Sequence, residues 1–448
     1  MAYPRIRVWG EEYLLNTHLQ TKSFQPVRVP VVCPKSPADS AFCFLNENPG
    51  HTLWLCNPAL RLSVTEESAL PPKNPNRPSL FEGVFPIGVY GATADTLEAV
   101  KRLAFNTVVI GGEEDGLRKQ VQLCHELSLK YIISVVPDPD RLVPLLARLQ
   151  GFVRPKETAF YVNDEPGIRS FPISRAEDVQ GLIKARFPGV ATCMAIVRPQ
   201  VCRTYLDAAD FFFLDPYPVP FMPMTWLSDV MDRAAQDAGA GRLGAVVQAF
   251  GGKDTKDEGW PRLPTWREMD CLSFLSVVHG GRGIFFFTFR VMGSTSEGRR
   301  RLGRVVGRLN TVYPWLKRMN ADLLIRVAMR SANRTDPQGR PAVHACLKRD
   351  GNSVLLIAVN TIATHVEADI VVPAWMALEE RDFEEVFRGE KVRLIQGRIR
   401  VRFGPYESKA FKGTLGNSLN AAMNGGPPVL LSPQGKNAAI AVKNRFVR

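Results

Sequence analysis

The chain has 448 residues, which is too long for one ordinary core and predicts two or three domains. Hydrophobic residues make up 45% and charged residues 23%, the balance of a globular protein, and no apolar run is long enough to span a bilayer. The net charge of +13 would attract anionic partners, but no stacking aromatics interleave with the basic clusters as they do in single-strand binders. We therefore expect neither a nucleic-acid nor a membrane partner, and the sequence leaves the oligomeric state open.

The N-terminal part of the chain contains short β-like runs, at Val27–Val32, Ala41–Leu45 and Thr52–Leu55. The proline-dense stretch from Leu70 to Pro78 cannot continue a helix or an inner strand, so it indicates a linker. Residues 1–78 are therefore predicted to be a β-rich segment followed by a linker. The first residues lack the layout of a signal peptide, which leaves two expectations: a cytoplasmic protein, or a secreted one whose leader was removed.

A regular rhythm of short apolar runs and amphipathic stretches begins at Gly83. The apolar runs are Val84–Tyr90, Thr107–Ile110, Tyr131–Val136, Ala159–Val162, Ala191–Ile196, Phe211–Leu214, Ala245–Ala249 and Gly283–Thr288. Several are apolar on both faces, as buried parallel strands must be. The intervening stretches are helical in pattern, and Thr265–Val278 opens with a capping box, Thr265 with Glu268.

Eight strands and eight helices predict an α/β fold, a closed (β/α)₈ TIM barrel, over residues 79–318. The alternative is a doubly wound open sheet, which usually carries a glycine-rich phosphate turn after its first strand. Here the first strand ends Ile87-Gly88-Val89-Tyr90-Gly91 without that motif, which favours the barrel.

The pattern changes after Leu316 to short strands separated by turn signals such as Asp350-Gly351-Asn352. The predicted strands are Leu323–Met329, Ala342–Arg349, Ser353–Asn360, Val366–Val372, Glu385–Phe387, Arg393–Ile395 and Ile399–Phe403. They indicate a C-terminal antiparallel β-sandwich over residues 319–413. Residues 414–448 are poor in bulky side chains and are predicted to be a low-complexity tail.

Barrel active sites lie at the carboxyl ends of the strands, so the polar residues there are the candidates for chemistry. Strand 4 ends Asn163-Asp164-Glu165-Pro166, strand 6 ends Asp215-Pro216-Tyr217, and strand 7 contains Gln248. Tyr90 ends strand 1, Trp260 follows strand 7 and Arg290 follows strand 8. Carboxylates, amides and aromatics at one rim suit a sugar, because rings cover its apolar faces while polar groups bind its hydroxyls.

These motifs resemble those of the large clan of (β/α)₈-barrel glycoside hydrolases, galactosidase-like members included. In that clan an Asn-Glu pair ends strand 4, and a small β-sandwich follows the barrel. The passage His279-Gly280-Gly281-Arg282-Gly283-Ile284-Phe285-Phe286 resembles the approach to strand 8 in the galactosidase-like members. The resemblance covers residues 83–413 and implies a glycosidase with Glu165 as general acid/base, cleaving an oligosaccharide or polysaccharide.

Glycoside hydrolysis requires two carboxyl groups, and the second has several candidates. The clan places a nucleophilic Glu at the end of strand 7, where this chain has Gln248, which cannot act as one. Asp215 could serve as base or nucleophile, and so could an acid of the loop after strand 7: Asp254, Asp257 or Glu258. Alternatively, the pair Asp164-Glu165 resembles hexosaminidases that use the substrate's acetamido group, with Tyr217 binding its oxygen.

The candidate substrate-binding residues are Asn163, Tyr217, Gln248, Trp260, Arg290 and Tyr90. Arg290 and Arg198 would give the rim a positive charge suited to a uronic or sialic acid. No metal-ligand cluster or cofactor motif is visible, so we expect neither a metal nor a cofactor. Two other functions stay open: a carbohydrate-binding barrel without catalysis, which Gln248 favours, and a nonhydrolytic barrel enzyme such as a lyase. In the purely structural interpretation, Asp164 and Glu165 only cap the turn before Pro166.

Overall fold

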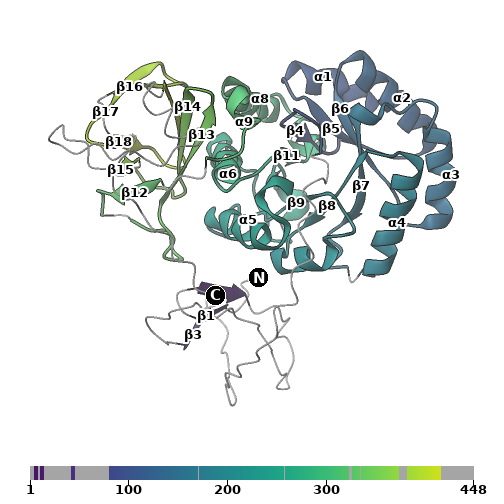
Figure 1. Cartoon of the computed structure of the whole chain (residues 1–448), viewed down its shortest axis with the longest axis horizontal. Coiled ribbons are helices and arrows are strands. Elements are labelled where there is room, and N and C mark those ends of the chain that lie inside the picture. Colours follow the sequence, from purple (N-terminus) through teal and green to yellow (C-terminus); the bar gives the residue numbers. More distant parts are fainter. Residues whose placement is uncertain are drawn as a thin grey trace, which may run out of the picture. The chain divides into compact units, whose positions relative to one another are not determined.

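Figure 1 shows the computed structural model, which describes residues 80–414 except 170, 257, 322–324, 333 and 373–380, and three N-terminal strands. The chain divides into two compact units, Met1–Lys73 and Asn74–Arg448. In the first unit β1 (Arg5–Val8) pairs antiparallel with β2 (Glu11–Leu14) and with β3 (Phe42–Leu45). The predicted run at Ala41–Leu45 corresponds to β3, whereas the other two predicted runs and the proline-rich stretch lie outside the described residues.

Eight parallel strands close into a barrel in the second unit, in the order β10-β11-β4-β5-β6-β7-β8-β9. The strands are β4 (Ile87–Val89), β5 (Thr107–Ile110), β6 (Lys130–Ser134), β7 (Thr158–Asp164), β8 (Ala191–Ile196), β9 (Phe211–Leu214), β10 (Leu243–Gln248) and β11 (Ile284–Phe287). All eight predicted runs overlap a strand, and β5, β8 and β9 have the predicted bounds. The closed parallel barrel confirms the predicted fold class.

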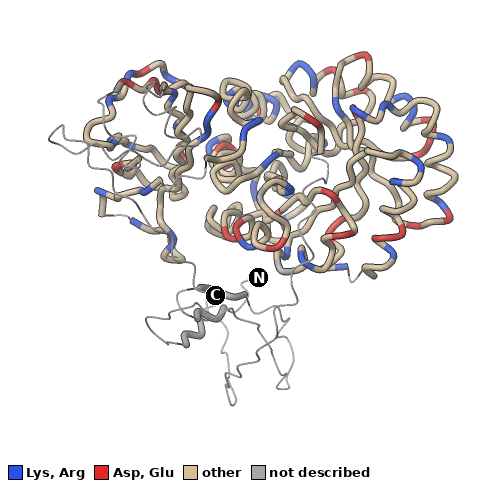
Figure 2. Tube along the Cα trace, in the orientation of Figure 1, with Lys and Arg blue, Asp and Glu red and all other residues tan. Residues whose placement is uncertain are grey.

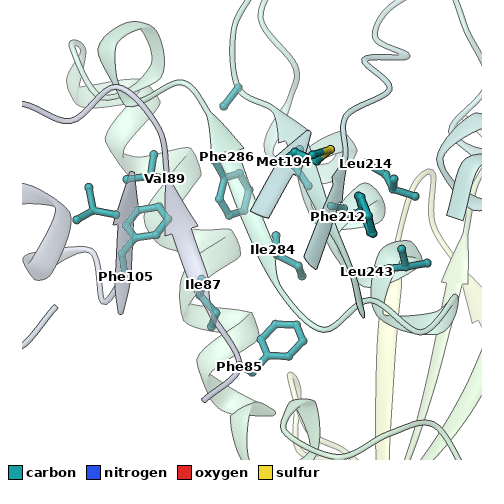
Figure 3. Packing of buried hydrophobic residues seen from close by; sticks show 14 of the residues in the cluster. Phe85, Ile87, Val89, Phe105, Met194, Phe212, Leu214, Leu243, Ile284 and Phe286 are labelled. Atoms are coloured by element: carbon teal, nitrogen blue, oxygen red, sulfur yellow. The ribbon is translucent and has the colours of Figure 1, made fainter. Parts of the chain in front are cut away.

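Alternate residues of each strand face opposite layers, which explains why the runs are apolar throughout. In β9, Phe211 and Phe213 belong to the cluster that fills the barrel, while Phe212 and Leu214 join the larger cluster between strands and helices. Figure 3 shows members of this outer cluster, among them Phe212 and Phe286. Strand β4 carries a glycine because a Cβ at Gly88 would lie 2.2 Å from the Phe285 ring inside the barrel.

Helices surround the barrel and cover the outer faces of its strands (Figure 1). They are α1 (Leu97–Arg102), α2 (Glu114–Glu126), α3 (Pro139–Leu149), α4 (Ile173–Arg186), α5 (Thr225–Ala238), α6 (Trp266–Val278), α7 (Phe289–Met292), α8 (Ser296–Thr311) and α9 (Tyr313–Leu316). The predicted capping box of α6 is present, with the Thr265 hydroxyl accepting from the Glu268 amide. The expectation of a helix after every strand is wrong between β8 and β9, where the short connection forms the 3₁₀ segment η3 (Pro199–Tyr205).

The region after the barrel forms two antiparallel sheets, as predicted, with orders β12-β15-β18 and β13-β14-β19-β16-β17. Their strands are β12 (Arg326–Met329), β13 (Val343–Asp350), β14 (Ser353–Asn360), β15 (Val366–Val371), β16 (Arg381–Glu385), β17 (Glu390–Leu394), β18 (Arg398–Phe403) and β19 (Ser408–Thr414). The sequence analysis missed β19, which is an inner strand between β14 and β16. The predicted strand at Glu385–Phe387 is also wrong beyond Glu385, because a turn leads there into β17.

Lys and Arg alternate with Asp and Glu over the outer helices (Figure 2). In the arginine cluster of α8, for example, Arg300 and Arg301 both form ion pairs with Glu297. The cluster is therefore a solvated helix face, as the sequence pattern indicates. Among the described residues, no helix is both long enough and apolar enough to cross a membrane.

Candidate active site

Two carboxylates, Glu165 and Asp215, meet at the carboxyl end of the barrel. Glu165 directly follows β7 and Asp215 directly follows β9, and these strands flank β8. Asp215 continues the alternation of Phe211 and Phe213, whose rings fill the barrel, so its side chain is on the inward register. The two carboxyl groups are near enough that each shifts the pKa of the other.

The environment of Asp215 strongly favours its protonated form. Asp215 is only 4% exposed, and its Oδ1 is buried without a hydrogen-bond partner among the described residues. Burial, followed by the charges of Glu165 and Asp164, raises the pKa of Asp215 well above its ordinary value.

Glu165 is more accessible to solvent and is flanked by cations. Burial and the neighbouring Asp164 raise the pKa of Glu165, while Arg169, Asp215 and Arg198 act to lower it. The upward shift of the pKa is larger for Asp215 than for Glu165, since Asp215 is the more deeply buried of the two. The arrangement thus supplies one carboxylic acid and one carboxylate side by side.

The backbone at Glu165 adopts a left-handed conformation, with φ of 46°. A residue with a Cβ pays roughly 1–2 kcal/mol for this conformation, so surrounding contacts must hold it. The Glu165 amide donates to the Ala195 carbonyl at 3.1 Å, and its carbonyl accepts from the amides of Ile168 and Arg169. These bonds hold the backbone turn at Glu165, where the chain leaves the direction of β7.

Asp164 is bound by its neighbours on both carboxyl oxygens. The Tyr161 hydroxyl donates to its Oδ1 at 2.7 Å, and Arg169 forms an ion pair with its Oδ2 at 2.7 Å. The side chain of Asp164 is 49% exposed, so it lies at the rim rather than inside the barrel. Asp164 therefore positions Arg169 beside Glu165, and its oxygens are already in use.

An aromatic layer lies around the carboxylate pair. The ring of Tyr217 stacks on Phe287 at 6.1 Å and meets the edges of Phe250 and Trp260. Tyr90 packs edge-on against Phe287 at 5.7 Å. Burial first, together with the charge of Asp215, raises the pKa of both Tyr90 and Tyr217 well above the ordinary value, so both stay neutral phenols.

Three of the predicted binding residues thus belong to one cluster with Asp215: Tyr90, Tyr217 and Trp260. The indole of Trp260 donates to the Tyr217 carbonyl at 3.2 Å, which leaves its ring face as the part that can meet a ligand. Asn163, only 7% exposed, lies at an irregularity in the pairing of β7 with β8.

Gln248 is not available to a substrate, in contrast to the sequence expectation. It is fully buried; its Oε1 accepts from the Val219 amide at 3.0 Å, and its Nε2 donates to the carbonyls of Val219 and Phe250. Every hydrogen-bonding atom of its amide is thereby used on the backbone. Gln248 holds the loop after β9, which carries Asp215 and Tyr217, against the end of β10.

The remaining predicted residues lie at the rim or outside the described side chains. Arg290 is an exposed residue of α7, and its Cβ lies 3.4 Å from the position that a Cβ on Gly91 would take, beside the end of β4. Glu258 is exposed in the loop after β10, and the side chains of Asp254 and Asp257 are not described. Within the described chain, no group of three or more His, Cys, Asp or Glu side chains is arranged to hold a metal ion.

The sequence analysis did not select two exposed aromatics on this face, Phe287 and Phe221. Phe287 is 38% exposed on the inward register of β11, two residues after Phe285, and Phe221 is 73% exposed in the loop after β9. The alternation within the run Ile284–Phe287 was the signal for Phe287. No local pattern marks Phe221, because exposure is decided by the fold.

Solved structures share this architecture at very low sequence identity. The wild-type GH27 β-L-arabinopyranosidase from Geobacillus stearothermophilus is 11% identical over 77% of this chain and 98% of that one, with a TM-score of 0.51. The α-amylase from Geobacillus thermoleovorans in complex with acarbose is 11% identical over 71% of this chain and 90% of that one, with a TM-score of 0.49. A GH30 endoxylanase from Clostridium papyrosolvens is 11% identical over 75% and 98%, with a TM-score of 0.47.

No protein-family model and no curated protein sequence matches the chain. At these identities the similarity to the arabinopyranosidase describes the fold alone. The chain is a (β/α)₈-barrel protein followed by antiparallel sheets, the architecture of the glycosidases it resembles. What it does must be argued from the carboxylate pair at the barrel mouth.

Proposed function

We propose that the protein is a glycoside hydrolase in which Asp215 is the general acid/base and Glu165 the nucleophile. The observation that carries the proposal is the interacting pair of carboxyl groups, one buried and one partly exposed, that directly follow β7 and β9. Glycosidases need one carboxylic acid to protonate the leaving oxygen and one carboxylate to attack or to activate water. A buried acid beside a more accessible carboxylate meets both needs at the same pH.

The roles differ from the sequence-based expectation that Glu165 is the acid. Asp215 is more deeply buried, and both its burial and the charges of Glu165 and Asp164 favour the protonated form. Glu165 has the cations Arg169 and Arg198 nearby, which favour its ionised form. The proton that cleaves the glycosidic bond would therefore come from Asp215, and Glu165 would attack the anomeric carbon.

An acid/base and a nucleophile acting in turn retain the configuration of the sugar. Retaining glycosidases place the two carboxyl groups about 5–5.5 Å apart, whereas inverting enzymes leave about 6.5–9.5 Å for a water molecule. Asp215, having lost its proton to the leaving group, would then act as base toward the water that hydrolyses the glycosyl-enzyme.

Substrate-assisted catalysis is the less favoured alternative. It needs Asp164 to orient an acetamido group, but the oxygens of Asp164 are already bound by Tyr161 and Arg169. The noncatalytic alternative depended on Gln248 standing where an acid is expected. That argument is weaker in the folded chain, because Asp215 supplies a second carboxyl group. Gln248 itself binds the backbone of the loop after β9.

The sugar would lie against the aromatic layer of the mouth. Phe287 and Phe221 expose ring surface on the face that carries Asp215, and apolar ring faces suit the C–H faces of a pyranose. Tyr90 and Tyr217 are neutral phenols near Asp215 and can donate to sugar oxygens. Among the solved structures with this fold, one arabinopyranosidase variant is described in complex with arabinose.

The test compares two variants on two classes of leaving group. A panel of aryl glycosides of different sugars and anomers first identifies a substrate for the wild-type chain. On a glycoside with a poor leaving group, Asp215→Asn should lose about 10²–10⁴-fold in kcat, the usual contribution of general acid catalysis. On the matching 2,4-dinitrophenyl glycoside, which needs no protonation to leave, formation of the glycosyl-enzyme should be nearly as fast as in the wild type.

Glu165→Gln should abolish turnover of both glycosides. Even a good leaving group cannot depart at a useful rate when the attacking carboxylate is missing. Glu177→Gln, an exposed acid on α4, is the matched control and should retain full activity. Full activity of Glu165→Gln would refute the proposal. Equal losses for Asp215→Asn in the rate of glycosyl-enzyme formation from both glycosides would remove Asp215 from the acid role.

A further inference from the structure

Arg198 places an uncommitted guanidinium beside the carboxylate pair. It lies two residues beyond the end of β8, the strand between β7 and β9. Its loop packs on the turn of Glu165: the Glu165 amide donates to the Ala195 carbonyl, and Val201 fills the space over Gly167. Arg198 is partly buried, and its charge acts on Glu165.

The other arginine at this turn is in a different situation. Arg169 is paired with Asp164 at 2.7 Å, so its guanidinium already has a carboxylate partner. Arg198, by contrast, has no ion pair and no side-chain hydrogen bond to any residue that the structure describes. Arg290, across the mouth in α7, likewise has no acidic partner among the described side chains. A partly buried guanidinium with unused donors at a candidate sugar site suits a carboxylate, which it can bind in a bidentate manner.

We propose that the sugar bound at the Glu165–Asp215 pair carries a carboxylate, as a hexuronic acid does, and that Arg198 binds this group. The inference rests on the proposed glycosidase function for its chemistry but not for its binding step. It gives Arg198 a role in specificity. A bound neutral hexose would leave the Arg198 guanidinium without an anionic partner, whereas the carboxylate of a uronic acid would pair with it.

A second arginine-lined cavity begins at the same rim. It has a volume of about 550 Å³, and its lining includes Arg102, Arg299 and Arg300 with Phe289 and Gly293. Phe289 and Gly293 flank Arg290 at α7, and α7 follows β11, the neighbour of β4 in the barrel. The lining also contains one acid, Asp95, so the role of this cavity in binding an acidic chain is tested separately through Arg102.

The closing experiment compares sugars that differ only at C6. Wild-type protein is assayed with 4-methylumbelliferyl glucuronide and glucoside, and with galacturonide and galactoside, in both anomeric forms. The expected kcat/KM is at least about tenfold higher for the uronide of the accepted pair, as a charge-assisted pair gives. Arg198→Gln should reduce that ratio about tenfold or more, mainly through KM, and Arg198→Lys should restore part of it.

Arg175→Gln is the matched control, because it removes one arginine charge from α4, where Arg175 pairs with Asp138. It should leave the ratio unchanged. A wild-type preference for the neutral sugar, or an Arg198→Gln variant with an unaltered ratio, would overturn the inference. An equal fall in the Arg175→Gln variant would also overturn it, since net charge alone would then explain the preference.

Binding separates this inference from the proposed function. Calorimetry with a trimer of galacturonic acid and with maltotriose uses wild-type, Arg198→Gln and Arg102→Gln proteins. If no glycoside is hydrolysed but the acidic trimer binds at least tenfold more tightly than the neutral one and Arg198→Gln abolishes this, glycosidase activity fails while the inference stands. If glycosides are hydrolysed and the two trimers bind equally, the glycosidase proposal stands and the acidic-sugar inference fails. Unchanged binding in Arg102→Gln would remove the cavity from the proposed path.

Discussion

At the scale of single residues, the chemistry of the mouth depends on the different environments of two carboxyl groups, Asp215 and Glu165. Asp215 is almost fully buried, whereas Glu165 is partly exposed and has arginines nearby. Burial disfavours charge, so the deeper carboxyl keeps the proton and the outer one carries the charge. The same burial is unfavourable for folding at neutral pH, because Asp215 would be ionised in the unfolded chain.

Asp215→Asn is therefore expected to stabilise the fold. The folded-state pKa of Asp215 lies above its unfolded value, so the wild-type protein loses stability as pH rises above about 4. At pH 7 the variant should gain at least about 1 kcal/mol, the free energy of one pKa unit, and the gain should shrink toward pH 4. Urea denaturation of both proteins from pH 4 to 8 measures this.

The control for that measurement is Asp178→Asn, an exposed acid of α4, which should change stability little at any pH. A destabilised Asp215→Asn variant at pH 7 would show that ionised Asp215 contributes to the native structure. That result would contradict the assignment of the acid role to Asp215.

The pair also predicts the pH dependence of activity. Turnover needs Glu165 ionised and Asp215 protonated, and the pKa of each is raised. The profile of kcat/KM should be bell-shaped, with its acid limb above the ordinary carboxyl range and its alkaline limb at the second apparent pKa of the pair. An activity that keeps rising into alkaline pH on a substrate with a poor leaving group would contradict a protonated Asp215.

At the scale of elements, the loop after β9 is positioned by a side chain of the neighbouring strand. Gln248 of β10 binds both the amide and the carbonyl of Val219, and Trp260 donates to the Tyr217 carbonyl. The loop that carries Asp215 is thus tied to the barrel at two points. Its geometry depends on residues that need not touch the substrate.

Gln248→Ala should consequently reduce both stability and turnover. Two buried backbone groups of Val219 would lose their partner, and this should cost at least about 2 kcal/mol. The loosened loop should lower kcat, which activity assays of the folded protein measure. Gln122→Ala on the exposed surface of α2, where Gln122 bonds Glu126, is the control and should cost little. A fully active Gln248→Ala variant would mean that other contacts hold the loop.

At the scale of the second unit, a buried ion pair connects the barrel helices with the C-terminal sheets. Asp270 of α6 is almost fully buried, accepts from Arg308 of α8 at 2.8 Å and accepts from Ser408 of β19. Arg308 also donates to the Ser408 carbonyl and lies over the Phe387 ring at 3.6 Å. Barrel and sheets share this contact, so we expect them to unfold together.

Asp270→Ala should destabilise both parts at once. Removing one partner leaves Arg308 buried without its carboxylate, which typically costs about 3–5 kcal/mol. Differential scanning calorimetry should show one transition at a lower temperature. Glu114→Ala, which breaks the surface pairs with Arg118 and Arg148, should cost at most about 1 kcal/mol. Two separate transitions in Asp270→Ala would show that the parts are stable independently.

The fold could be predicted from the sequence because its signals are local. Buried parallel strands are apolar on both faces, and the runs at Thr107–Ile110, Ala191–Ile196 and Phe211–Leu214 coincide with β5, β8 and β9. The capping box at Thr265 was readable for the same reason, since its partners are three residues apart. By contrast β19 was missed: it carries lysines and a glycine, and its place between β14 and β16 comes from pairing with distant strands.

The sequence by itself determined which strand ends carry carboxylates, Asp164-Glu165 and Asp215, because a residue that follows a barrel strand is at the mouth whatever its partners are. Only the tertiary structure decided which of these groups meet, which is buried and which is already bound. It brought Asp215 to Glu165, occupied Asp164 with Tyr161 and Arg169, and turned Gln248 to the backbone. Protonation and availability depend on burial and on neighbours far apart in the chain, and no local pattern encodes these.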